Sequence, residues 1–208
     1  MTTDAQRRAD GERTHAVILE AATKLASIEG VHGLTIGRLA EITGISKSGL
    51  YAHFGSKEQL QLEVIQAAGA IVEREVVAPA LEKPPGLERL ETMLEAFFSY
   101  VERWVFPGGC FFSSLLAEAD AMEGAIHDAV VAGQKEASAG WAGLVREAQE
   151  TGELDRKLDA EQIGFELEAV MGQSNYLYVL FRDPKALEHG RNAVRRILEA
   201  GKPKSKKR

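Results

Sequence analysis

Residues 36–54 contain two short stretches in which apolar positions recur with the period of a helix. The apolar side chains recur at three- and four-residue steps in residues 36–43 and again in residues 47–54, the spacing that one face of a helix requires. Thr35 and Ser46 each stand where a helix N-cap is expected. Gly44 follows the first period, and glycine ends helices because it adopts positive φ at little cost. The pattern predicts a helix-turn-helix over about residues 36–55.

The second of these helices is predicted to bury Leu50 and Phe54, which lie four residues apart. Its outer face then carries small, polar and basic side chains, namely Lys47, Ser48, Gly49, Tyr51 and His53. Such a helix fits the major groove of B-DNA. Lys57 lies in the first turn of the next helix, where an ammonium and free backbone N–H groups can share one phosphate. This pattern favours a DNA-binding surface over a merely solvated face.

The rest of the chain also repeats its apolar positions at helical steps. No stretch alternates with the two-residue period of a strand, so the predicted fold is all-α with about nine helices. Beyond the two motif helices, the expected helices cover residues 13–29, 57–77, 87–104, 110–122, 124–150, 159–181 and 185–200. Four segments follow in order: a disordered arm (1–12), the helix-turn-helix domain (13–56), a helical body (57–201) and a basic disordered tail (202–208).

Charge is unevenly distributed along the 208 residues, whose net charge is -6. Residues 1–60 hold seven basic and seven acidic side chains, whereas residues 61–201 hold 13 basic and 24 acidic ones. Phosphate contacts supply much of the affinity for DNA, and the acidic excess lies outside the segment predicted to make them. The N-terminus is polar, and no apolar run is long enough to cross a membrane. We therefore expect a cytoplasmic protein without a membrane partner.

Motifs for catalysis, cofactors and metals are not found in the sequence. It contains no phosphate loop, dinucleotide glycine pattern or nucleophile elbow, and its five histidines are too scattered for a metal cluster. Cys110, the single cysteine, lies in an apolar run and is expected to be a core residue. An enzyme and a helical adaptor remain the alternatives to a DNA-binding regulator. Loss of DNA binding on replacing Tyr51 or Lys57 would separate them.

From Arg13 to about Ile65 the chain resembles the DNA-binding domain of the TetR family of bacterial transcriptional regulators. The resemblance rests on EGVHGLT at residues 29–35 and on LYAHFGSKEQL at residues 50–60. It implies that Thr35 holds a phosphate and that Tyr51, His53 and Lys57 contact the DNA backbone. The positions that it places in the groove are Ser46, Lys47, Ser48 and Gly49.

The resemblance also implies a homodimer and a small-molecule effector. Two helices from each subunit, at residues 159–181 and 185–200, would form a four-helix bundle whose interface includes Phe165, Val170, Leu177, Val194, Ile197 and Leu198. An apolar pocket is expected among Phe97, Trp104, Phe111, Phe112, Trp141, Met171, Asn175 and Tyr176. The function expected is a dimeric repressor that leaves a near-palindromic double-stranded DNA operator when a largely apolar ligand binds.

Overall fold

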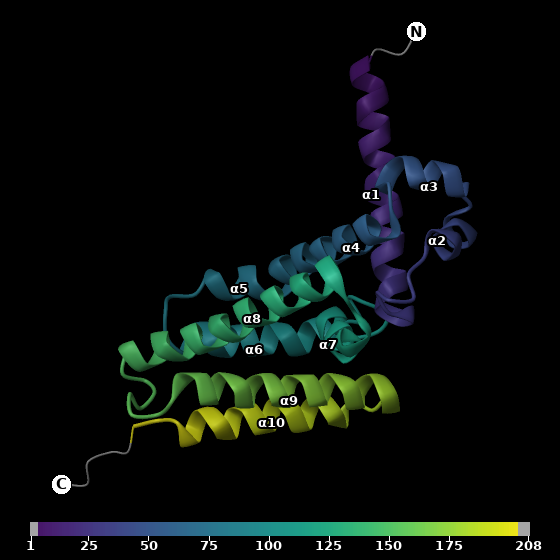
Figure 1. Cartoon of the computed structure of the whole chain (residues 1–208). Coiled ribbons are helices and arrows are strands. Elements are labelled where there is room, and N and C mark those ends of the chain that lie inside the picture. Colours follow the sequence, from purple (N-terminus) through teal and green to yellow (C-terminus); the bar gives the residue numbers. More distant parts are fainter. Residues whose placement is uncertain (1–3, 204–208) are drawn as a thin grey trace, which may run out of the picture. The chain divides into compact units, whose positions relative to one another are not determined.

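The computed structural model describes residues 4–203, and within that range every regular element is helical (Figure 1). This confirms the all-α prediction. The helices are α1 (Asp4–Glu29), α2 (Ile36–Thr43), α3 (Lys47–Phe54), α4 (Lys57–Val72), α5 (Ala78–Leu81), α6 (Leu87–Glu102), α7 (Phe111–Ala117), α8 (Gly124–Glu150), α9 (Ala160–Phe181) and α10 (Lys185–Ala200). A π-helical turn spans Glu73–Val77, and a 3-10 turn spans Ala119–Ala121.

The chain forms two compact units. The first contains the residues up to Ile71 together with Phe106–Ala129, and the second contains Val72–Val105 together with the residues from Val130 on. This division differs from the predicted boundary between residues 56 and 57. The reason is that α4 and the distant segment 106–129 pack with the helix-turn-helix.

Helix α1 begins at Asp4, so the predicted disordered arm is wrong for residues 4–12. This segment carries no large apolar side chain and therefore shows no hydrophobic period. Its alanine, glutamine, arginine and glutamate residues are nevertheless good helix formers, and adding residues to a helix that is already nucleated costs little. Residues 1–3 of the predicted arm and 204–208 of the predicted tail lie outside the described residues.

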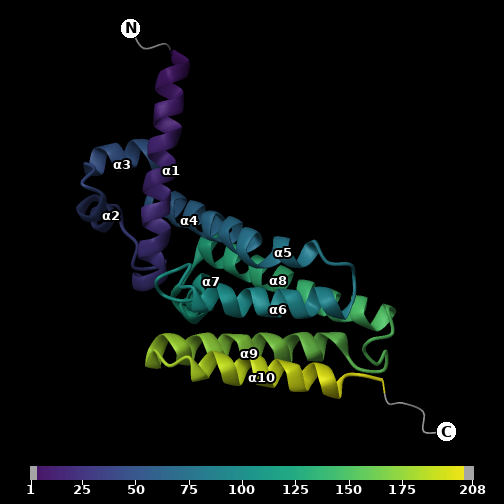
Figure 2. The ribbon, with the colours of Figure 1, turned by 180° about the vertical axis from the view of Figure 1, so that it is seen from behind.

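The first unit packs α2 and α3 against α1, and both ribbon views show them on the same side of that helix (Figures 1 and 2). Ile18 and Ala22 are among the buried side chains of α1, and Leu39 and Leu50 are fully buried in α2 and α3. These apolar contacts fix the helix-turn-helix and leave the opposite side of α3 exposed.

Helix α4 continues through the π-helical turn into α5, so the break expected at residues 78–86 comes only after Leu81. Pro79 lies in the first turn of α5. In a regular helix its ring would collide with the carbonyl group of Glu75, four residues earlier, and its nitrogen has no hydrogen to donate. The wider π-helical turn accommodates the proline at this point.

In the second unit, α9 and α10 run side by side as a helical hairpin (Figures 1 and 2). Gly190 makes their close packing possible. A Cβ atom at this position would lie 2.2 Å from the Ser174 hydroxyl oxygen and 2.7 Å from a ring carbon of Phe98. Arg191, the next residue, donates to Glu95 at 2.9 Å and to Glu102 at 2.8 Å, which ties α10 to α6.

Candidate DNA-binding surface

Side-chain caps define the ends of the helix-turn-helix. The Thr35 hydroxyl accepts a hydrogen bond from the Arg38 N–H at 3.1 Å, and the Ser46 hydroxyl accepts one from the Gly49 N–H at 3.1 Å. Gly44 has the left-handed conformation, with φ 70°, and donates its N–H to the Ala40 carbonyl group. The predicted caps and turn are therefore confirmed, and they set the angle between α2 and α3.

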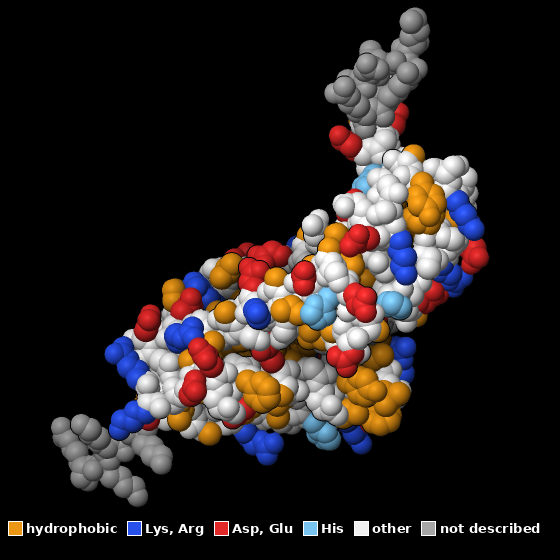
Figure 3. All heavy atoms as spheres, in the orientation of Figure 1, with side chains coloured by type: hydrophobic (Ala, Val, Ile, Leu, Met, Phe, Trp, Pro, Cys, Tyr) orange, Lys and Arg blue, Asp and Glu red, His pale blue; other side chains and the backbone are white. Residues whose placement is uncertain are grey.

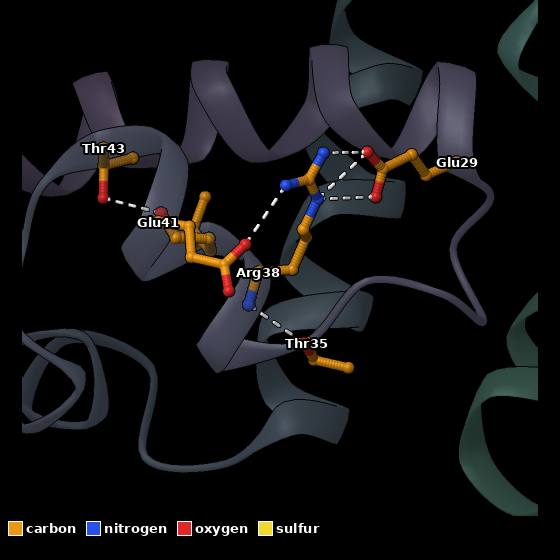
Figure 4. A network of polar contacts seen from close by, with 6 residues as sticks. Glu29, Thr35, Arg38, Glu41 and Thr43 are labelled. Atoms are coloured by element: carbon orange, nitrogen blue, oxygen red, sulfur yellow. Dashed lines mark hydrogen bonds and ion pairs between the residues drawn. The ribbon is translucent and has the colours of Figure 1, made fainter.

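Arg38 fastens α2 to the end of α1 (Figure 4). Its guanidinium donates to both carboxylate oxygens of Glu29, at 2.6 Å for the shortest contact, and to Glu41 at 3.1 Å. This bidentate pair holds a fixed geometry better than a single contact does. Helix α2, which precedes α3, is thus anchored by polar as well as apolar contacts.

Helix α3 has one buried and one exposed side, as the sequence predicts. Leu50 and Phe54 are 0% and 2% exposed, whereas Tyr51 is 52% exposed. The exposed group also includes Ser46, Lys47 and Ser48, while Gly49 and His53 are half-buried. The outer side therefore offers hydroxyl and ammonium donors, which suit phosphate oxygens and base edges.

His53 is less accessible than its predicted role would suggest, because it lies beside other rings. Its ring centroid is 5.8 Å from that of His15 and 6.3 Å from that of Phe54. The His15 ring nitrogen Nε2 lies 2.7 Å from a Glu63 carboxylate oxygen. His15 thus packs against α3, and Glu63 holds the His15 ring in place. The sequence carried no local signal for them, since they lie 48 positions apart.

Lys57, at the start of α4, is exposed, and its ammonium donates to the His32 carbonyl oxygen at 3.0 Å. An ammonium has three N–H donors, so two remain for a phosphate. Ser56 caps the same helix by accepting from the Gln59 N–H at 3.0 Å. The His32 N–H in turn donates to Glu118, at 2.9 Å. Glu118 is a neighbour that the sequence did not indicate.

A cavity of about 380 Å³ adjoins Lys57 within the first unit. Its walls mix polar and apolar groups, including Val31, His32, Gln61, Met122 and Ile126. None of the eight residues predicted to line an effector pocket contributes to it.

The eight predicted pocket residues are divided between the two units. Phe111 and Phe112 belong to the first, where their rings lie 5.4 Å apart, and the other six belong to the second. Met171 and Asn175 are buried, and Phe97 packs near Phe98. Trp104 stacks on Tyr178 at 4.9 Å, and Trp141 is half-buried.

Tyr176 does not fit the predicted pocket, because it is 63% exposed. It lies eleven residues after Phe165, which is 65% exposed, and this spacing places the two on the same face of α9.

The six predicted interface residues differ in exposure. Phe165 is exposed and Val170, Leu177 and Ile197 are half-buried, whereas Val194 and Leu198 are only 6% and 4% exposed. The last two pack inside the second unit and stabilise α10 rather than offering a surface. Leu180 and Phe181, which the sequence analysis did not select, are 60% and 63% exposed. Figure 3 shows hydrophobic side chains gathered over this end of α9.

A capped helix-turn-helix whose second helix presents donors to solvent, within an all-α chain, defines a helix-turn-helix DNA-binding protein. Comparison with known families agrees. The model described as bacterial regulatory proteins of the tetR family matches residues 18–64, and the tetracyclin repressor-like C-terminal domain matches residues 86–194. The chain belongs to the TetR family of DNA-binding transcriptional regulators. This family assignment excludes the enzyme alternative.

Curated relatives include an activator and a repressor. The transcriptional activator FasR of Mycolicibacterium smegmatis is 32% identical over 85 residues, which cover 41% of this chain and 39% of FasR. The repressor AcnR of Corynebacterium glutamicum is 34% identical over 89 residues, covering 38% of this chain and 46% of AcnR. The matches thus span less than half of either relative.

Solved structures match nearly the whole chain. A TetR transcriptional regulator from Chloroflexus aurantiacus J-10-FL has a TM-score of 0.82 at 25% identity, covering 92% of this chain and 95% of that one. AibR, solved in complex with isovaleryl coenzyme A and operator DNA, has a TM-score of 0.68 at 20% identity, covering 86% and 94%. Within residues 4–203, no helix has both the length and the apolarity needed to span a bilayer.

Proposed function

We propose that the protein is a homodimeric repressor that binds a near-palindromic operator and leaves it when a small, largely apolar ligand binds the helical body. The observation that carries the proposal is the capped, outward-facing helix α3, with Lys57 at the start of α4 beside it. The acidic excess of residues 61–201 is consistent with a body that stays away from the DNA. A regulator of bacterial DNA acts in the cytoplasm.

The proposed DNA contacts have two kinds. The proposed base contacts come from the N-terminal end of α3, because that end of a recognition helix meets the base edges. This end consists of Ser46, Lys47, Ser48 and Gly49. A Cβ atom on Gly49 would lie 3.2 Å from Ile45 Cγ2 and 3.3 Å from the Ser46 hydroxyl oxygen, so a larger residue would crowd the cap. The proposed phosphate contacts come from Thr35, Tyr51, His53 and Lys57.

The dimer is supported by the exposed face of α9. One recognition helix reads only a few base pairs, whereas two related by a two-fold axis read half-sites roughly 34 to 36 Å apart. Phe165, Tyr176 and Leu180 form an apolar surface that a second copy would cover.

Ligand release is supported by one structural relative. The AibR structure contains isovaleryl coenzyme A and operator DNA, so one chain of this fold accommodates both. Coupling between two such sites is commonly about 1 to 3 kcal/mol, a change of roughly 5- to 150-fold in affinity. The name of AcnR supports repression, and that of FasR shows that activation is the competing outcome.

Selection from random duplex DNA tests the proposal without knowledge of the operator. We expect enrichment of a near-palindrome, which the protein then binds with strong salt dependence in fluorescence anisotropy. Replacing Tyr51 or Lys47 by alanine should weaken this binding. Lys135→Ala is the matched control, because it removes an exposed lysine from α8 in the second unit. Failure to enrich any sequence, or equal behaviour of Lys47→Ala and Lys135→Ala, would contradict the proposed operator contacts.

A further inference from the structure

The turn between α1 and α2 is held by side chains from two other helical segments. Its backbone groups make three such hydrogen bonds: Gln61 Nε2 donates to the Val31 carbonyl oxygen at 2.6 Å, the His32 N–H donates to Glu118 at 2.9 Å, and Lys57 Nζ donates to the His32 carbonyl oxygen at 3.0 Å. Gln61 and Lys57 belong to α4. Glu118 follows α7, 86 positions after His32.

Two of these bonds involve the same peptide group. The Val31 carbonyl group and the His32 N–H belong to one planar unit, so Gln61 and Glu118 hold that unit at opposite ends. Hydrogen bonds at both ends of a peptide polarise it and reinforce each other, and the carboxylate makes a charge-assisted bond. The next carbonyl group along the chain, that of His32, accepts from Lys57.

The Glu118 carboxylate also lies closely against the start of the turn. Gly30 has φ +83°, and a Cβ atom there would be 2.6 Å from Glu118 Oε1. Glycine is thus favoured by the backbone conformation, and its lack of a side chain leaves room for the carboxylate at this distance. The turn and Glu118 therefore form one closely packed unit.

We propose that Glu118 is a positioning residue for DNA binding, which holds the Lys57 ammonium at the start of α4 through the backbone of residues 31 and 32. The inference rests on the proposed phosphate contact of Lys57. At that helix start, the ammonium and the free backbone N–H groups converge on one anion. Glu118 bears a negative charge and does not itself contact the phosphate. Its effect on affinity must pass through Lys57.

The sign of the effect separates positioning from simple electrostatics. Removing an acidic group near DNA reduces repulsion and strengthens binding, so Asp120→Ala serves as the charge-matched control two positions away on an exposed site. Glu118→Ala should instead weaken operator binding, by roughly 3- to 10-fold, a modest coupling for neighbouring groups. Glu118→Gln keeps an oxygen acceptor and should retain most of the affinity. Glu118→Asp keeps the charge, withdraws the carboxylate and should also weaken binding.

A double-mutant cycle with Lys57→Ala provides the test, using anisotropy of the selected operator across a salt series. We expect Lys57→Ala to lower the salt slope by about 0.9 for each phosphate that the variant no longer neutralises. Glu118→Ala should move the slope in the same direction and should add nothing in the Lys57→Ala background.

Each outcome of the cycle identifies a different failure. Unchanged binding by Lys57→Ala would refute the proposed phosphate contact itself. If Lys57→Ala weakens binding but Glu118→Ala behaves like Asp120→Ala and Glu118→Asp binds like the wild type, the positioning role is wrong. If Glu118→Ala weakens operator binding equally in the wild-type and Lys57→Ala backgrounds, its effect does not depend on Lys57 and comes from general damage to the first unit. This result would also overturn the inference. Thermal denaturation of each variant confirms that the protein compared is folded.

Discussion

Replacing Phe165 by alanine tests whether the outer face of α9 forms the subunit interface. Phe165, Tyr176 and Leu180 are each at least 60% exposed, and their spacing places them along one stripe of the helix. Ala169 and Gly172 lie between them, and a Cβ atom on Gly172 would meet nothing within 4 Å. Large residues separated by small ones allow a second helix to approach closely, and monomers rarely expose such a continuous apolar surface.

The size of the effect follows from the exposed area. A phenylalanine buries about 200 Å² when fully covered, so the 65% exposure of Phe165 leaves roughly 130 Å² for a partner. At about 25 cal/mol per Å², this area corresponds to about 3 kcal/mol per subunit and about 6 kcal/mol per dimer. These values are upper limits, because association also orders side chains. We expect Phe165→Ala to weaken the free energy of dimerisation by at least half of this upper limit, about 3 kcal/mol, which raises the dimer dissociation constant roughly 150-fold.

Sedimentation equilibrium over a range of protein concentrations measures this constant directly. Leu81→Ala is the matched control, since Leu81 is 53% exposed but lies on α5. A wild-type protein that sediments as a monomer at every concentration would refute the dimer. A wild-type dimer whose dissociation constant is unchanged by Phe165→Ala would refute this face as the interface.

Three further predictions concern the second unit. Trp104 has φ 52°, a conformation that costs residues other than glycine about 1 kcal/mol. Trp104→Gly should therefore be about 1 kcal/mol more stable than Trp104→Ala in urea unfolding, and equal values would contradict the strain. Arg89, whose side chain is 15% exposed, pairs with Glu147 at 3.1 Å, and the Glu147 side chain is 32% exposed. Arg89→Ala should therefore cost about 1 to 2 kcal/mol by removing charge-assisted hydrogen bonds, and a melting temperature no lower than that of Arg146→Ala would refute this. The Arg103 guanidinium lowers the pKa of Glu75. The ionised Glu75 thus stabilises the fold above its unfolded pKa, and this contribution is lost as pH falls through the lower folded value. Glu75→Gln should therefore flatten the acid decline of the unfolding free energy below about pH 4.5, and an unchanged decline would exclude a contribution from this pair.

The helix-turn-helix was predictable because its determinants are local. A cap needs one hydroxyl group three positions before the N–H that it binds, and a left-handed turn needs one glycine. Thr35, Ser46 and Gly44 supply these features within a dozen residues, and each has the predicted conformation. The start of α1 was missed for the opposite reason, since helix propensity without apolar residues gives no periodic signal.

Neighbours that are distant in sequence were not predictable from such patterns. Glu118 and Glu63 are ordinary glutamates in the sequence, and nothing near them indicates His32 or His15. Their importance appears only when segment 106–129 and α4 are packed beside the turn that follows α1. The candidate site therefore has two parts: donors on α3 that local chemistry reveals, and supporting carboxylates that depend on tertiary structure.

The predicted interface residues show what helical periodicity cannot determine. Apolar residues occur on more than one side of α9 and α10, so spacing alone does not say which side faces the core and which faces a partner. Val194 and Leu198 are buried because Gly190 lets α10 approach α9 and α6 closely. This close approach depends on tertiary packing, which the spacing of apolar residues does not reveal. Phe165 and Tyr176 share one face of α9 and remain exposed. An effector that shifted α9 would therefore alter the proposed dimer surface together with the core that supports it, and dimer dissociation measured with and without ligand would detect that link.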